Sequence, residues 1–219
     1  MKTLITVVLI TIVSCTLVQA GEYASGITAK GIKVGFGLNT MSTSVNEFEN
    51  EESMAGGYIG AFLTYGLSPR VSIEMELAFV SRGAGASLFG SREWRYNYIE
   101  VPVLFRYSLT EQSRLTPYLY FGPAVSFLTA ANFKSSLFSH TIYTEDAANS
   151  PGFSLVFGGE VDYGRFMLDV RYVLGLTNNY DPTEWNRVVD ATSTTDIFHM
   201  SSDDYMKNRS VTFLLGFKI

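Results

Sequence analysis

Apolar and polar residues alternate along most of the chain. In residues 153–172, every second residue belongs to a face that is apolar or aromatic. The other face carries Glu160, Asp162, Asp169 and Arg171 among small residues. A period of two is typical of β-strands, because successive side chains point to opposite faces. No helical period is evident between the alternating segments. Eight such segments can be marked, at residues 31–40, 56–66, 70–82, 94–108, 116–130, 152–163, 165–176 and 209–219.

The connections between these segments alternate between long and short. The long connections are residues 41–55, 83–93, 131–151 and 177–208, and the short ones are residues 67–69, 109–115 and 163–164. Long loops at one end and tight turns at the other are typical of outer-membrane barrels, whose long loops face outside. Strands of about 9 to 11 residues also suit a tilted crossing of a bilayer. The pattern predicts an all-β fold, an eight-stranded antiparallel transmembrane β-barrel with four external loops.

The alternative is a soluble lipid-binding barrel, in which the apolar face would point inward. Its outer face would then carry many glycines and alanines, which are poor strand formers with no evident purpose there. Inside an eight-stranded membrane barrel, small residues make room for larger side chains such as Tyr98, Tyr118, Tyr120 and Arg106. The apolar face carries no charge where the alternation is clear, as expected of a surface that faces lipid. Aromatic residues also lie near strand ends, as interfacial girdles do, namely Tyr65, Trp94, Tyr107, Tyr163 and Tyr172.

Charged residues of the other face are therefore predicted to fill the barrel as ion pairs. A conducting or proton-carrying lumen is the alternative, with pairs such as Glu100 with Arg106 or Asp169 with Arg171. If residues 163–164 form a two-residue turn, Asp162 lies opposite Arg165. The acidic residues in 153–172 are predicted to pair with Arg106, Lys33 and Lys218.

The N-terminus has the features of a secretory signal peptide. Lys2 precedes an apolar run that ends at Val18-Gln19-Ala20, so residues 1–20 are predicted to be cleaved and residues 21–219 to form the barrel domain. Lipidation of Cys15, the only cysteine, is an alternative processing route. The chain has 21 acidic and 16 basic residues without a basic cluster, so no nucleic-acid partner is expected.

Four stretches of the chain resemble the porT-type family of outer-membrane β-barrel domains, common in the Bacteroidetes. They are GGYIGAFLTYGLSPRVSIEMELAFVSRGA (56–84), YNYIEVPVLFRYSL (96–109), TPYLYFGPAVSFL (116–128) and GGEVDYGRFMLDVRYVLGLTN (158–178). The most specific is Tyr98-Ile99-Glu100-Val101-Pro102. The chain departs from the family's usual aromatic end, because it finishes Phe217-Lys218-Ile219. The resemblance implies an outer-membrane barrel and implies little about activity.

Few residues suggest chemistry. The two histidines, His140 and His199, lie in predicted loops, and His199-Met200-Ser201 is similar to the His-x-Ser spacing of outer-membrane lipid A deacylases. A solvated loop histidine is the competing interpretation. Acidic residues in the loops could bind calcium or bridge to lipopolysaccharide, although such residues are usually just solvated. They are Glu47, Glu49, Glu51, Glu52, Asp203 and Asp204.

The sequence thus predicts a small outer-membrane protein with a structural or binding role, which displays its four external loops to the surroundings or to a partner in an envelope or secretion assembly. Its expected partners are outer-membrane lipid, the barrel-assembly machinery during biogenesis and an unidentified envelope protein. No catalytic, cofactor-binding or metal-binding residue is predicted, and no enzyme activity is expected. A lipid-modifying hydrolase is the alternative from another class.

Overall fold

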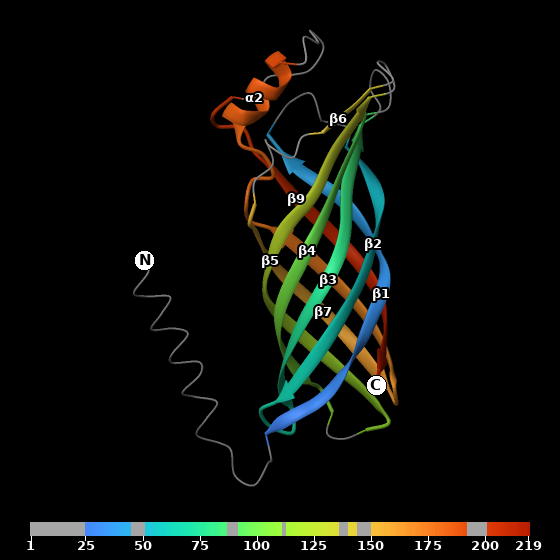
Figure 1. Ribbon diagram of the computed structural model, residues 1–219. Coiled ribbons are helices and arrows are strands. Elements are labelled where there is room, and N and C mark those ends of the chain that lie inside the picture. The colour runs from blue at the N-terminus through green and yellow to red at the C-terminus, as the bar shows by residue number, and fades with distance from the viewer. Residues whose placement is uncertain are drawn as a thin grey trace, which may run out of the picture.

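The sheet closes into a barrel in the computed structural model, which describes residues 25–44, 51–86, 92–110, 113–135, 140–143, 150–191 and 201–219. Each strand runs antiparallel to its neighbours in the order β4-β3-β2-β1-β9-β8-β7-β5, and β4 also pairs with β5. Eight strands therefore form the predicted barrel (Figure 1). The strands are β1 Gly26–Thr43, β2 Glu51–Gly66, β3 Val71–Ala86, β4 Arg92–Ser108, β5 Leu115–Ser135, β6 His140–Tyr143, β7 Gly152–Tyr163, β8 Phe166–Gly175 and β9 Met206–Lys218.

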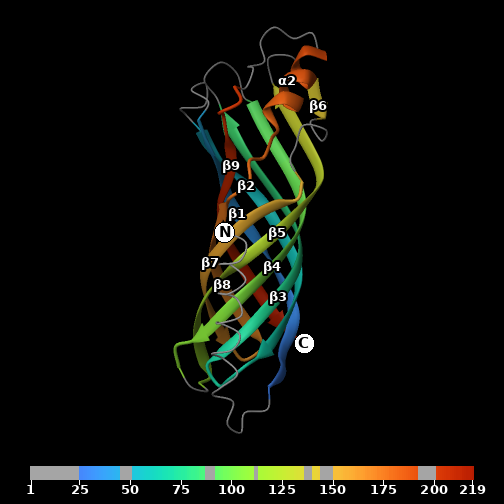
Figure 2. The ribbon, with the colours of Figure 1, turned by 90° about the vertical axis from the view of Figure 1, so that its left-hand side faces the viewer.

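The barrel has two different ends. At the turn end, β2, β4 and β7 are joined to β3, β5 and β8 by short connections, and β9 finishes there beside the start of β1. At the loop end, all barrel strands except β7 and β8 extend beyond their predicted segments, and β6 pairs with residues 132–135 of β5. The helix α2, Pro182–Ala191, also lies at the loop end in both ribbon views (Figures 1 and 2).

The helix α2 contradicts the expectation that no helix lies between the strands. Asp181 caps it, because its carboxylate accepts hydrogen bonds from the backbone N–H groups of Thr183 and Glu184 at 2.8 and 3.2 Å. Proline at the first helical position suits a helix start, since its missing N–H would have no partner there. Among the described residues, no helix is long and apolar enough to cross a membrane.

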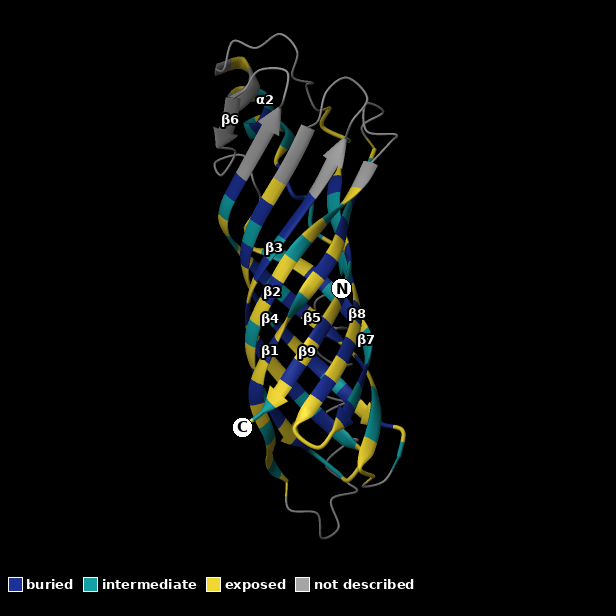
Figure 3. Ribbon diagram, turned by 90° about the vertical axis from the view of Figure 1, so that its right-hand side faces the viewer, coloured by how far each residue is buried: buried dark blue, intermediate teal, exposed yellow. Residues whose placement is uncertain are grey.

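The two faces of the strands separate as predicted. Figure 3 shows buried and exposed residues alternating along the barrel strands. On β1, for example, the outward residue Phe36 is 54% exposed, whereas the inward residue Lys33 is 1% exposed. The apolar face is therefore on the outside and the charged face on the inside, so the soluble lipid-binding alternative is wrong. Among the predicted girdle residues, Tyr65, Tyr107, Tyr163 and Tyr172 are exposed, and the side chain of Trp94 lies outside the described part.

The β7–β8 hairpin differs from the prediction by one step of register. Tyr163 pairs with Phe166, so the turn consists of Gly164 and Arg165. Gly164 has φ of +60°, which a glycine adopts without steric cost. The predicted Asp162–Arg165 pairing is therefore wrong: Asp162 lies opposite Met167, and Arg165 is exposed. Both registers keep the same residues on each face, so face alternation could not distinguish them.

Candidate functional site

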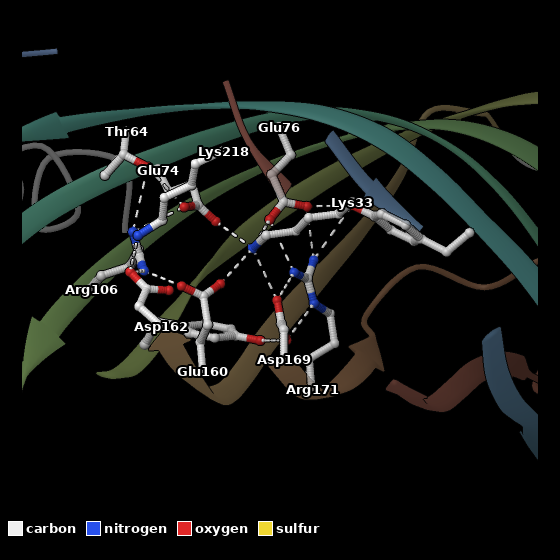
Figure 4. Close-up of polar contacts among 12 residues, drawn as sticks. Lys33, Thr64, Glu74, Glu76, Arg106, Glu160, Asp162, Asp169, Arg171 and Lys218 are labelled. Atoms are coloured by element: carbon white, nitrogen blue, oxygen red, sulfur yellow. Dashed lines mark hydrogen bonds and ion pairs between the residues drawn. The ribbon is translucent and has the colours of Figure 1, made fainter. Parts of the chain in front are cut away.

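A network of ion pairs crosses the turn-end half of the lumen (Figure 4). Its centre is Lys33 on β1, whose Nζ lies 2.6 Å from Glu74 and 3.0 Å from Glu76, both on β3. From the opposite wall, Glu160 on β7 and Asp169 on β8 approach the same nitrogen to 2.8 and 3.0 Å. All five side chains are almost completely buried. One amine therefore joins strands on both sides of the barrel.

Two guanidinium groups compensate the carboxylates that surround Lys33. Arg106 on β4 pairs with Glu74 at 3.0 Å and with Glu160. Arg171 on β8 pairs with Glu76 at 2.9 Å and with Asp169, which confirms the predicted Asp169–Arg171 pair. Buried charges are tolerated only when they are paired and hydrogen-bonded. Each of the four carboxylates meets this condition, because it pairs with Lys33 and with one of the two arginines.

Hydroxyl groups complete the network. Thr64 Oγ1 donates a hydrogen bond to Glu74 at 2.9 Å, Tyr58 donates to Glu76, and Tyr120 donates to Asp169. The tyrosine on β5 fits because the residue beside it is Gly158. A Cβ atom at Gly158 would lie 2.2 Å from the Tyr120 hydroxyl oxygen. This close approach supports the prediction that small inward residues make room for large ones.

At the turn end of the network, the lumen holds a polar cavity of about 130 Å³. Lys218 on β9 pairs there with Asp162, and Arg106 lies 3.8 Å from the same carboxylate. Arg106 also lies with its guanidinium carbon 4.2 Å from the ring centre of Tyr118. The predicted partners Lys33, Arg106 and Lys218 are thus confirmed.

A separate ion pair lies nearer the loop end. Arg82 on β3 pairs with Glu100 on β4 at 2.6 Å, and Ser126 donates a hydrogen bond to the same carboxylate at 3.1 Å. The predicted pairing of Glu100 with Arg106 is wrong. These residues are six positions apart on one strand, roughly 20 Å along its axis, which is too far for contact. Arg82 was missed because it lay at the last position of its predicted segment.

An aromatic cap fills the loop end of the lumen. Tyr180 and Trp185 are 0% and 2% exposed, and their rings lie 4.9 Å apart. Tyr180 also contacts Tyr96 of β4 at 5.8 Å between ring centres. We define the aromatic cap as Tyr96, Tyr180 and Trp185. Trp185 belongs to α2, which lies at the loop end of the barrel (Figure 2), so the helix contributes one of the three cap residues.

Polar contacts attach the cap to the strands. Asn179 donates hydrogen bonds to Asn208 Oδ1 at 3.1 Å and, through its backbone N–H, to the Met206 carbonyl at 2.7 Å. Asn208 in turn donates to the Tyr98 hydroxyl at 3.3 Å. A cavity of about 30 Å³ lies beside these groups. The sequence carried a signal for this region, because Asp181-Pro182 followed by Glu184 is typical of a helix start.

The lumen is therefore occupied at three levels, by the ion-pair network, by the Arg82–Glu100 pair and by the aromatic cap. The charged side chains of the network pair with one another. An eight-stranded barrel has an interior that is only just wide enough for its own side chains. This arrangement is suited to rigidity of the barrel.

A family profile described as an outer membrane protein beta-barrel domain matches residues 28–181. The chain belongs to this family. A comparison with curated proteins found no match in sequence. This outer-membrane barrel is identified at the level of the broader family, and the porT-type assignment stays a prediction.

Solved structures to which the chain is similar include three bacterial proteins. Neisserial surface protein A, NspA, is 10% identical, with a TM-score of 0.51 over 89% of this chain and 99% of that chain. OprG of Pseudomonas aeruginosa is 11% identical, with a TM-score of 0.48 over 89% and 97%. Ail, the attachment invasion locus protein of Yersinia pestis, is 14% identical, with a TM-score of 0.42 over 89% and 99%. The likeness to NspA supports the fold of the barrel.

Of the predicted candidates for chemistry, Ser201, Asp203 and Asp204 lie in the described part of the chain. Ser201 lies at the loop end, where its backbone N–H donates a hydrogen bond to Asp204 at 2.8 Å. The same carboxylate accepts a hydrogen bond from the Ser44 hydroxyl at 3.0 Å. His199 lies outside the described residues, as do the side chains of His140, Glu51 and Glu52 and the whole of Glu47 and Glu49. Within the described part of the chain, no three His, Cys, Asp or Glu side chains are arranged to hold a metal ion.

Proposed function

We propose that this outer-membrane barrel has a structural or binding role and presents four loops to the outside of the cell. One observation supports the proposal, namely that paired charges and the aromatic cap occupy the lumen. Charged side chains that already pair with one another are poorly suited to transport or catalysis. The loop end therefore remains as the surface through which the protein would act.

The proposal includes orientation and export. Loops outside and turns in the periplasm follow the habit of bacterial barrels. Residues 1–20, which include Cys15 and lie outside the described part, would serve as a signal peptide cleaved after Ala20. The barrel-assembly machinery would insert the mature chain. An envelope or secretion assembly would supply the partner of the loops.

The partner can be tested by affinity capture from detergent-solubilised membranes of the source cell. One variant replaces residues 182–191 by glycine and serine, which removes α2 while keeping the barrel strands. The matched control is Lys30→Gln/Arg165→Gln, which changes exposed residues at the turn end. We expect a specific partner to be lost from the loop variant and kept by the control. Loss from the control alone would place the binding surface in the periplasm and contradict the proposal.

Conduction and catalysis need separate assays. Purified full-length protein in planar bilayers is expected to give no steady conductance, because paired side chains cross the lumen. A stable open channel would contradict the proposed role. Incubation with lipid A is expected to release no fatty acid. Release that Ser201→Ala abolishes would establish the hydrolase alternative.

A further inference from the structure

On the outer wall of the barrel, two basic residues lie immediately above the apolar belt. Arg209 and Lys207 face outward on β9, two positions apart. Below them on the same strand come Val211, Phe213, Leu215 and Phe217, all facing outward. On the neighbouring strand β8, Leu174 lies opposite Arg209. Arg209 therefore marks the border between the apolar belt and the loop end.

Two hydroxyl-bearing residues lie directly beside these basic residues. Thr40 of β1 pairs with Arg209, and Ser42 of β1 pairs with Lys207. All four side chains belong to the outward-facing set of their strands. We call Thr40, Ser42, Lys207 and Arg209 the β1–β9 polar patch. One register step below it, Leu38 pairs with Val211 and the belt begins.

The dimensions of the patch suit one small anionic group. Neighbouring strands lie about 5 Å apart, and residues two apart on a strand are about 7 Å apart. Two cationic and two hydroxyl side chains thus rise from an area that a single phosphate group can bridge. Lys207 makes a cation–π contact with Tyr205, whose ring centre lies 5.6 Å from the ammonium nitrogen. The patch therefore supplies both charge and hydrogen-bond donors at one point.

The charges of the patch differ from those inside the barrel. Lys33, Arg82, Arg106, Arg171 and Lys218 all pair with carboxylates in the lumen. By contrast, within the described residues, no carboxylate pairs with Lys207 or Arg209. Basic side chains at a lipid-facing border are stabilised by anionic lipid headgroups. Lys207 and Arg209 therefore lie on the outer wall of the barrel, where an anionic lipid can neutralise their charges.

We propose that the β1–β9 polar patch binds the phosphate of a lipid headgroup in the leaflet at the loop end. The acyl chains of that lipid lie on the apolar side chains next to the patch, with Leu174 beside Arg209 and Leu38 and Val211 below it. A lipid fits better than a soluble anion, because the polar patch and the apolar surface are continuous along β9. The inference goes beyond the proposed function and does not depend on which way the loops face.

Native mass spectrometry of the full chain in detergent tests the site. The probes are dioleoyl phosphatidate, which carries a phosphate monoester, and dioleoyl phosphatidylcholine, whose headgroup is zwitterionic. We expect the wild type to retain one phosphatidate in preference to phosphatidylcholine. In Lys207→Gln/Arg209→Gln, phosphatidate affinity is expected to fall roughly 30-fold, because each basic residue near a membrane surface contributes about a 5-fold attraction.

The control Lys30→Gln/Arg165→Gln removes two exposed bases at the turn end and is expected to leave phosphatidate affinity unchanged. Thr40→Val/Ser42→Val keeps both charges and the strand propensity, and it is expected to lower affinity roughly 5-fold through the lost hydroxyls. Heat-modifiable gel migration verifies that each variant is folded. Equal losses in the patch and control variants, or no loss in the patch variant, would overturn the inference. Displacement of phosphatidate by equimolar inorganic phosphate would show a site for free anions and would also overturn it.

Discussion

The ion-pair network makes a specific prediction about Lys33. Lys33→Met keeps the length and apolar stem of the side chain but removes the charge that four carboxylates share. The loss is not four times that of one ion pair, because Arg106 still holds Glu74 and Glu160 and Arg171 still holds Glu76 and Asp169. Four buried carboxylates then share two guanidinium groups, so the number of uncompensated negative charges in the network rises from one to two. Breaking a buried pair in this way costs about 3–5 kcal/mol of unfolding free energy.

The assay is guanidinium unfolding of the full chain in phosphatidylcholine vesicles, followed by tryptophan fluorescence. Lys218→Met is the matched control, because Lys218 is 23% exposed and contacts Asp162 at the turn end. Its expected cost is about 1 kcal/mol or less.

A double variant tests the cause of the loss. Lys33→Met/Glu160→Gln removes one of the negative charges left behind, so its destabilisation should be smaller than the sum of the single variants by roughly 0.5–3 kcal/mol. Equal effects of Lys33→Met and Lys218→Met, or strict additivity in the double variant, would refute the reasoning. Either result would mean that Lys33 does not hold the network together.

Three further predictions concern the close approach in the lumen and the loop-end cap. Gly158→Ala is expected to push Tyr120 aside and to cost about 1–3 kcal/mol in the same unfolding assay, whereas Gly159→Ala should cost little, because its Cβ would meet nothing nearer than 3.5 Å. Asp181→Ala is expected to lower stability of the helix by about 1 kcal/mol through loss of its cap, with Asp181→Asn nearly neutral; faster proteolysis within residues 176–205 measures the effect. Trp185→Ala is expected to raise the proteolysis rate further while the barrel keeps its heat-modifiable migration, and an unchanged rate would show that Trp185 does not hold the cap.

The barrel could be predicted because lipid imposes a simple rule on its sequence. Every outward position must be apolar, so a period of two along residues 153–172 was enough to assign both faces. The same rule identified Lys33, Arg106 and Lys218 as interior bases, since a base that faces lipid within the apolar belt is costly. Side chains that share a small lumen must then pair with one another.

What the pattern could not supply was the position of each residue along the barrel axis. Registers that differ by two residues leave the faces unchanged, so the turn at Gly164 and Arg165 was placed one residue early. The pairing of Glu100 with Arg82 depends on the register between β3 and β4 in the same way. The helix α2 was missed for another reason, because its ten residues lie within residues 177–208, which were assigned as a whole to one long loop.

The interior network also constrains the order of events in folding. Lys33 is 127 residues from Glu160 and 136 residues from Asp169 along the chain, so these charges meet only when the two ends of the sheet come together. An open sheet already inside the bilayer would face hydrocarbon with unpaired charges, at a cost of several kcal/mol for each ion. Insertion and closure must therefore proceed together. The last pairing, of β9 with β1, is the step at which the charges of the lumen become shielded from lipid.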